Sequence, residues 1–291
     1  MMAACVQSIG RTVRFRALIC ALALALAACG SATRLVYDSA EPAVLVIANR
    51  YLALEGDQWK RARIATGRFH AWHRRNELPR YAALFAEAAG RVQRGLARAD
   101  VDWAIQSVRT RYAALVEAAV RESMPLVETL DAENVAAVER RFAQEDRKRV
   151  REHLSGNLAK HERERVTALV KRFEEWTGPL TDAQVALVGQ FVAATADYPQ
   201  YAHELRLRRQ RELVALLERG VREDSPPPAE ELRSLFVAWG LERTPERRRR
   251  DEQFAQLLLG LDRSLTAAQR TRVVERLTGY AADARALARG A

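Results

Sequence analysis

The chain has 291 residues and a formal net charge of +10, from 47 Lys and Arg against 37 Asp and Glu. Hydrophobic residues make up 48% of it, which is enough for a buried core and excludes a disordered or fibrous chain. The 3 cysteines, Cys5, Cys20 and Cys29, all precede the main part of the chain, which excludes a disulfide-stapled fold.

The first 29 residues have the pattern of an export signal. A basic region precedes an apolar run over 17–28; the run is too short to span a bilayer, which needs about 20 residues. Leu26-Ala27-Ala28-Cys29 resembles the lipobox of bacterial lipoproteins, which implies cleavage before Cys29 and acylation of its thiol and amino group, palmitate included. The alternative is an ordinary signal peptide with a chance cysteine. Because Gly30 follows, and not Asp, the resemblance implies an outer-membrane lipoprotein whose body lies in the periplasm.

The rest of the chain predicts a lipidated tether over 29–40 and a helical body over 41–223. A Pro-rich linker over 224–229 follows, because Pro226, Pro227 and Pro228 cannot donate backbone hydrogen bonds. We expect residues 230–291 to form C-terminal helices that pack on the body.

Apolar residues recur at spacings of three and four along the whole body, which indicates helices with one buried face. The expected helical regions are 41–52, 56–89, 98–121, 131–154, 158–176, 181–197, 205–221, 232–239, one that begins at 244, and 266–288. No stretch alternates with period two for long enough to predict a strand. The fold class is therefore all-α, an antiparallel, bundle-like assembly of about eight to ten helices. The first region, 41–52, predicts either a short buried helix or a helix on the membrane surface.

One helix-start motif recurs along the chain. In Leu180-Thr181-Asp182-Ala183-Gln184, Thr181 and Gln184 form a capping box, in which each side chain bonds the backbone N–H of the other. A second full copy begins at Leu265, and weaker copies begin at three other leucines, Leu54, Leu96 and Leu130. Their irregular spacing argues against a solenoid. The motif predicts where helices begin.

A polar and aromatic block runs from Trp72 to Tyr81. Pro79 breaks the helix there, and Asn76 is a candidate cap for its restart. His70, His73 and Glu77 share one helical face, which makes them the best candidate for a metal site. A hydrogen-bonded polar cluster is favoured instead, because a fourth ligand would have to come from another helix and the arginines around His73 would repel a divalent cation. In such a cluster, Glu77 pairs with an arginine three residues away, either Arg74 or Arg80.

This block resembles the signature of the DUF6279 family of bacterial lipoproteins. The lipobox, Tyr37, the stretch 176–181 and the closing Leu265-Thr266 helix extend the resemblance over nearly the whole mature chain. It implies a helical protein of the cell envelope. Within the block, the candidate interaction site comprises Trp72, His73, Arg74, Glu77, Pro79 and Tyr81.

The Leu-Thr-x-x-Gln copies are also similar to the motif of periplasmic chaperones and adaptors of the Spy and CpxP kind. No motif of a hydrolase, phosphate loop or dinucleotide site occurs. We therefore predict a non-enzymatic binding, scaffold or adaptor protein without catalytic residues, cofactor or metal, and a Spy-like chaperone as the alternative. The expected partners are the membrane, an envelope protein or an anionic lipid, which Arg247–Arg250 could contact, but no nucleic acid.

Overall fold

The computed structural model describes residues 37–290; the predicted signal peptide, Cys29 and most of the tether lie outside this range. Within it, all regular elements are helical, which confirms the all-α prediction. The α-helices are α3 (Ala40–Leu52), α4 (Gly56–Asn76), α5 (Leu78–Gln93), α6 (Arg98–Val127), α7 (Ala132–Arg149), α8 (Leu158–Thr177), α9 (Asp182–Ala194), α10 (Tyr198–Arg222), α11 (Ala229–Leu241), α12 (Pro245–Ser264) and α13 (Ala267–Arg289). These 11 helices exceed the eight to ten expected, because Glu77 divides the region 56–89 into two.

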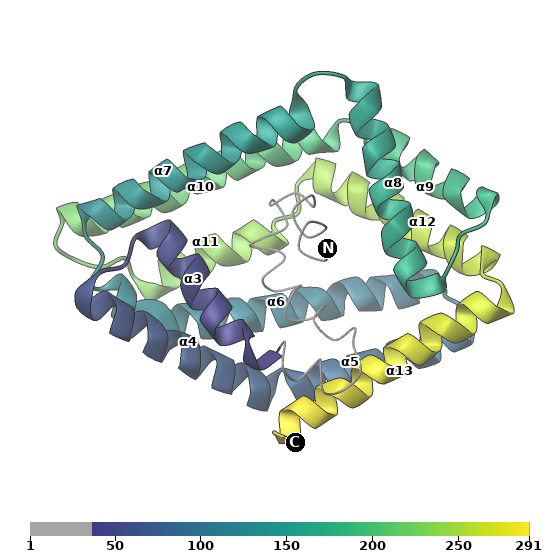
Figure 1. Ribbon diagram of the computed structural model, residues 1–291, viewed down its shortest axis with the longest axis horizontal. Helices are drawn as coiled ribbons and strands as arrows, with labels where there is room; N and C mark the ends of the chain where they lie inside the picture. Colours follow the sequence, from purple (N-terminus) through teal and green to yellow (C-terminus); the bar gives the residue numbers. More distant parts are fainter. Residues whose placement is uncertain (1–36, 291) are drawn as a thin grey trace, which may run out of the picture.

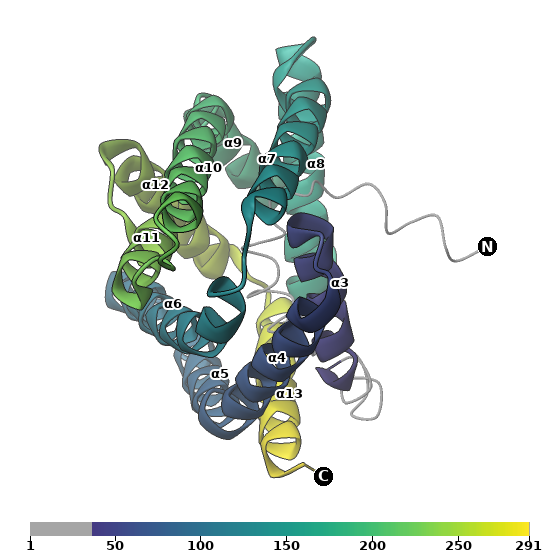
Figure 2. The same cartoon turned by 90° about the vertical axis from the view of Figure 1, so that its left-hand side faces the viewer.

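The helices form a four-sided frame and not one compact bundle (Figure 1). Each side is built from helices that lie side by side: α7 with α10, α9 with α8 and α12, α13 with α5, and α6 with α4 and α11. In the perpendicular view, the partners of these pairs separate into two layers (Figure 2). Helix packing is therefore mostly pairwise, and helices distant in sequence form several of the sides.

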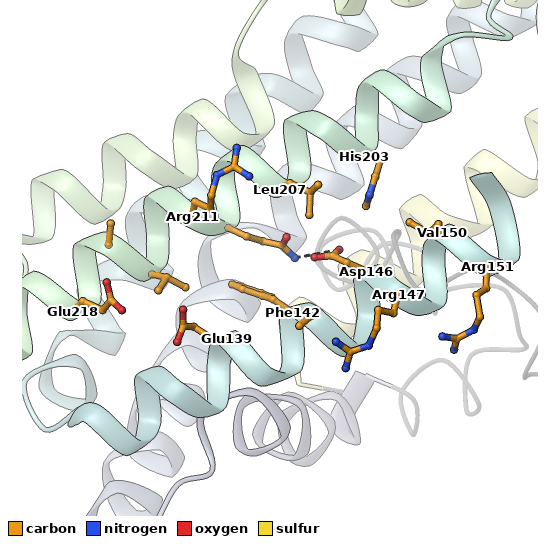
Figure 3. Close-up of a pocket in the computed structure, with 14 residues that line it drawn as sticks. Glu139, Phe142, Asp146, Arg147, Val150, Arg151, His203, Leu207, Arg211 and Glu218 are labelled. Carbon is orange, nitrogen blue, oxygen red and sulfur yellow. Dashed lines mark hydrogen bonds between the residues drawn. The ribbon is translucent and has the colours of Figure 1, made fainter. Parts of the chain in front are cut away.

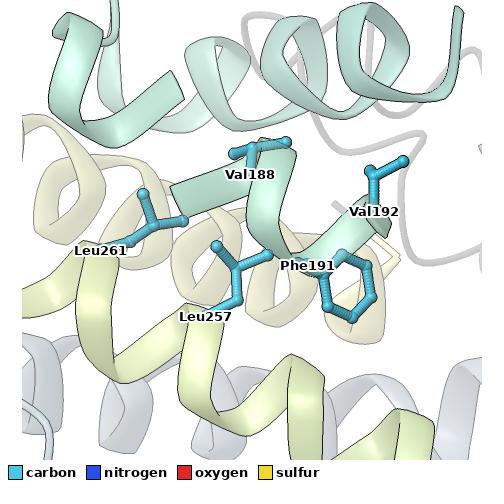
Figure 4. Close-up of a cluster of buried hydrophobic side chains, with 5 residues drawn as sticks. All are labelled: Val188, Phe191, Val192, Leu257 and Leu261. Carbon is cyan, nitrogen blue, oxygen red and sulfur yellow. The ribbon is translucent and has the colours of Figure 1, made fainter. Parts of the chain in front are cut away.

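The buried apolar residues follow this arrangement and lie in separate clusters between neighbouring helices. One cluster joins α9 to α12 through five residues, Val188, Phe191, Val192, Leu257 and Leu261 (Figure 4). Val188 and Val192 have no exposed surface, and the Phe191 ring packs edge-on against Phe254 with centroids 5.7 Å apart. Each side of the frame thus has its own small core.

The helix-start motifs meet in pairs at two corners of the frame. At one corner, Gln184 and Gln269 form two side-chain hydrogen bonds with each other, of 2.9 and 3.0 Å. Gln184 also donates to the Ser264 carbonyl at 3.0 Å, and Gln269 donates to the Pro179 carbonyl at 2.8 Å. Each glutamine therefore caps its own helix and closes the turn before the other.

The same pairing joins the turn before α4 to the turn before α7. Gln58 donates to Asn134 at 2.8 Å, and Asn134 donates back at 3.2 Å. The two amides also bond the carbonyls of Thr129 and Leu52, at 2.7 and 2.8 Å. Asp131 caps α7 as predicted, accepting hydrogen bonds from two backbone N–H groups. The motif predicts the caps from the sequence alone, whereas the contact between two copies of the motif is visible only in the structure.

The two paired corners occupy corresponding places in two halves of the chain, whose helices pack in a similar way. In the first half α4 packs on α6 and α3 on α7; in the second half α9 packs on α12 and α8 on α13. Helices of the two halves also pack on one another: α7 of the first half packs on α10 of the second, and α13 of the second half packs on α5 of the first. The C-terminal helices α11, α12 and α13 thus contact α6, α9 and α5, respectively, across the proline-rich segment. No helix within residues 37–290 is long and apolar enough to cross a membrane.

Candidate functional site

The block from Trp72 to Tyr81 lies where α4 ends and α5 begins. Glu77 separates the two helices, and Pro79 lies in the first turn of α5, where its missing N–H costs nothing. The prediction that Asn76 caps the restart is wrong. Its side chain instead donates a 2.9 Å hydrogen bond to the Trp72 carbonyl, one turn back in α4.

His73 anchors the start of the described chain to α4. Its exposed fraction is 1%, and its Nδ1 lies 2.9 Å from the Tyr37 hydroxyl, which is equally buried. The Tyr37 ring stacks on His73 with centroids 5.8 Å apart, and Nε2 of His70 lies 3.3 Å from the Tyr37 carbonyl. Burial lowers the pKa of His73 to about 3 and raises that of Tyr37 to about 12. Both groups are therefore neutral near pH 7.

Glu77 is the second fully buried polar member of the block, with no exposed surface. Its carboxylate accepts a 3.1 Å hydrogen bond from Arg80 and one of 3.2 Å from Arg111 of α6. Of the two predicted partners, Arg80 is confirmed; Arg74 instead forms an ion pair with Asp38. The carboxylate thus joins the α4–α5 break to the middle of α6.

The other members of the block lie around its two buried polar residues, His73 and Glu77. Arg74 lies over the Tyr37 ring, 5.2 Å from its centroid, and Tyr81 is half-buried with its ring 5.5 Å from that of His73. Trp72 is half-buried beside Phe69, and Pro79 is exposed. His73 and Glu77 therefore serve to orient helices, whereas contact of the exposed members with a partner stays a prediction. His70, His73 and Glu77 do not converge, and no group of three metal-binding side chains occurs within residues 37–290.

We expect the stability of the protein to fall as the pH is lowered from about 6.5, because His73 must be protonated on unfolding. Its pKa is near 6.5 in the unfolded chain and about 3 in the fold, so the unfolded state binds more protons in this window. The loss reaches about 2 kcal/mol at pH 5, at 1.36 kcal/mol per pH unit.

Urea unfolding at pH 7.5 and pH 5 measures this difference. His73→Asn, whose amide cannot titrate, should flatten the dependence, although burial also lowers the pKa of His153 and His203 and leaves a residual slope. Equal slopes for the variant and the parent would contradict the assignment to His73.

The basic run Arg247–Arg250 points around α12 and does not form one surface. Arg247 is 6% exposed and donates to the Glu242 and Trp239 carbonyls, both at 3.0 Å. Arg249 pairs with Asp197, and Arg250 lies over the Tyr198 ring. These contacts within the protein explain the positions of the arginines without a bound lipid. The binding of an anionic lipid by Arg247–Arg250 stays a prediction.

Sequence patterns miss several partners of the site. Arg111 is one of many arginines on α6, and nothing in its spacing indicates that it bonds Glu77. Tyr37 is part of the family resemblance, but its contact with His73 joins residues 36 positions apart. The pairing of Gln184 with Gln269 joins residues 85 positions apart.

Three comparisons with known proteins identify one family. No curated protein and no solved structure is significantly similar to the chain. Residues 50–240 match the family DUF6279, whose description is "Family of unknown function". This match spans α4 through most of α11 and includes both the Trp72–Tyr81 block and the Gln58–Asn134 corner. The chain belongs to the DUF6279 family.

Proposed function

We propose that the protein is a lipid-anchored, non-enzymatic scaffold of the bacterial cell envelope, acylated at Cys29 and held at the outer membrane with its body in the periplasm. Its partner is an envelope protein or an anionic lipid. The alternative is a chaperone of the Spy kind, in which Gln184 and Gln269 of the shared motif would still close a corner of the frame.

The observation that supports this proposal is that Tyr37, which lies close to Cys29 in the sequence, is held in place against α4. Tyr37 follows Cys29 by eight positions, so the two Cα atoms are at most about 28 Å apart even in a fully extended chain. His73, His70 and Arg74 tie Tyr37 to α4. An acyl anchor on Cys29 would thus hold the whole frame close to the bilayer, with α3 at the membrane side. The half-exposed apolar residues of α3, such as Val46 at 58%, suit that position.

Replacement of the anchoring cysteine tests the proposal. We expect Cys29→Ala to abolish incorporation of labelled palmitate and to release the protein from the membrane fraction, because several buried acyl chains provide the attachment. Cys20→Ala, a second cysteine of the same segment, is the matched control and should retain both signals. Continued acylation of the Cys29→Ala variant would overturn the proposal.

A further inference from the structure

The outer face of helix α4 carries an excess of positive charge. Asp57, in its first turn, is the only acidic residue of the helix, whereas lysine or arginine occupies positions 60, 61, 63, 68, 74 and 75. Three of these cations and one apolar residue form a line along the helix, which we call the α4 stripe: Lys60, Ile64, Arg68 and Arg75. Their intervals of four, four and seven residues place them on one face. All are exposed, Ile64 to 44%, and the stripe is about 22 Å long at 1.5 Å per residue.

The three cations of the α4 stripe are unpaired within the described part of the chain, 37–290. Their side chains form no hydrogen bond or ion pair there. The nearby carboxylates do not compensate them: Asp57 pairs with Arg61 at 2.8 Å, and Glu41 of the neighbouring helix α3 lies against Gly67 without an ion pair to any residue from 37 to 290. The stripe therefore presents uncompensated positive charge to its surroundings.

Other parts of the surface combine both signs of charge. The groove between α7 and α10 has Glu139 and Glu218 at one end and Arg147 at the other (Figure 3). On α6, the exposed side chain of Arg98 pairs with Glu252 of α12 at 2.7 Å. An excess of one sign along most of a helix therefore distinguishes α4 from these surfaces.

The α4 stripe lies close to the proposed attachment to the membrane. Tyr37 is held against the C-terminal half of α4 by His73 and His70. It follows Cys29 by eight positions, which is at most about 28 Å of extended chain. This location rests on the proposed function, since acyl chains on Cys29 would keep α4 beside a bilayer. Helix α3, with its exposed Val46, packs next to α4.

The composition of the stripe fits a bilayer with anionic headgroups. Lysine and arginine side chains near a membrane anchor are attracted to anionic phospholipids, and their apolar stems lie along the interface while the charges meet the phosphates. Ile64, between two of the cations, supplies an apolar side chain for the interfacial region, which an acidic protein surface does not require. We propose that the α4 stripe binds the surface of a bilayer through its anionic phospholipid headgroups, with Ile64 in the interfacial region and α4 parallel to the membrane.

Vesicle binding of the purified mature chain with Cys29→Ala tests the stripe apart from the acyl anchor. The probes are vesicles of phosphatidylcholine alone and vesicles that also contain phosphatidylglycerol. Each cation near an anionic surface strengthens binding about fivefold, so we expect about 100-fold tighter binding to the anionic vesicles at low salt. Salt at about 0.5 M should abolish the difference by screening. The same screening keeps this binding too weak to retain the Cys29→Ala chain in a membrane fraction washed with salt.

Two triple variants separate the stripe from the net charge of the protein. The stripe variant replaces its three cations: Lys60→Gln, Arg68→Gln and Arg75→Gln. The matched control replaces one lysine and two arginines at exposed positions of α8: Arg163→Gln, Lys171→Gln and Arg172→Gln. We expect the stripe variant to lose nearly all of the preference for anionic vesicles, about 100-fold, and the control to stay within about twofold of the parent. Both should keep the parent melting temperature, because the replaced side chains have no ion-pair partner from 37 to 290.

A single fluorescent label locates the contact. The mature chain with Cys29→Ala has no cysteine, so an added one can be labelled alone. We expect a polarity-sensitive dye at Ile64→Cys to shift its emission to the blue on anionic vesicles, because it enters the interfacial region. Leu158→Cys is the matched control, since Leu158 is an apolar residue of α8 that is 72% exposed, and its emission should not change.

Three results would overturn the proposal. Equal binding to both kinds of vesicle would exclude an anionic bilayer and leave an acidic protein as the occupant of the stripe. Equal losses for the two triple variants would attribute the binding to net charge. A blue shift at position 158 and none at position 64 would place another face of the frame on the bilayer. Because every chain tested here carries Cys29→Ala, a failure of the stripe leaves the proposed acyl anchor standing, and a failure of acylation leaves these results unchanged.

Discussion

Replacing Gln184 with alanine should lower the free energy of unfolding by about 3–4 kcal/mol, because the substitution leaves several buried polar groups without partners. The Gln184 side chain has no exposed surface and takes part in four hydrogen bonds, with Thr181, Ser264 and twice with Gln269. The melting temperature should fall by roughly 8 °C for a domain of this size. Urea unfolding and calorimetry measure both changes.

A double-mutant cycle shows whether the two glutamines act as one unit. We expect Gln184→Ala and Gln269→Ala together to cost at least about 1 kcal/mol less than the sum of the single variants, since each leaves the other unpaired. Gln58→Ala provides the matched control. Gln58 makes the same kind of hydrogen bonds at the other corner but is only half-buried, so its replacement should lower the free energy of unfolding by less. Additive effects would contradict the coupling.

Glu77→Ala should destabilise the protein by about 3 kcal/mol, near the lower end for the loss of one partner from a buried ion pair. The substitution removes the acceptor of Arg80 and Arg111 from a site with no exposed surface. Arg80 is half-exposed and can turn to water, but the Arg111 side chain is only 21% exposed. Most of the loss therefore arises from Arg111, and urea unfolding at pH 7.5 measures it.

An exposed ion pair within α5 provides the comparison. Glu87 pairs with Arg91 at 2.8 Å and its side chain is 52% exposed, so Glu87→Ala should cost at most about 0.5 kcal/mol. Glu77→Gln retains a hydrogen-bond acceptor of nearly the same size and should fall between the two. If Glu77→Ala were as mild as Glu87→Ala, the buried carboxylate would not hold α6 to the α4–α5 break.

Helix starts were the most predictable part of the fold. The capping residues Asp131, Thr181 and Thr266 all lie at N-caps in the structure, because a cap is a local arrangement of three or four residues. The break at Pro79 was also predictable, since proline limits the helix by its own geometry. The end of α6 was not: Pro125 lies within its last turns, and the helix continues to Val127, beyond the expected end near Arg121.

The arrangement of the helices and the partners at the site could not be predicted. An apolar stripe shows which face of a helix is buried but not which helix covers it, so a bundle and a frame are compatible with the same pattern. The contacts of Glu77 with Arg111 and of Gln184 with Gln269 depend on that arrangement.

The packing of α13 along α5 has a consequence for the order in which the chain folds. Tyr280 and Leu287 of α13 cover Leu78 and Phe85 of α5, so a helix late in the sequence completes the core of a much earlier one. Loop closure over such a distance is slow and follows local helix formation. A chain that is being synthesised from its N-terminus therefore keeps that apolar face of α5 exposed until α13 has been made. Any chain cut short before Thr266 therefore exposes the apolar face of α5, a surface that favours aggregation.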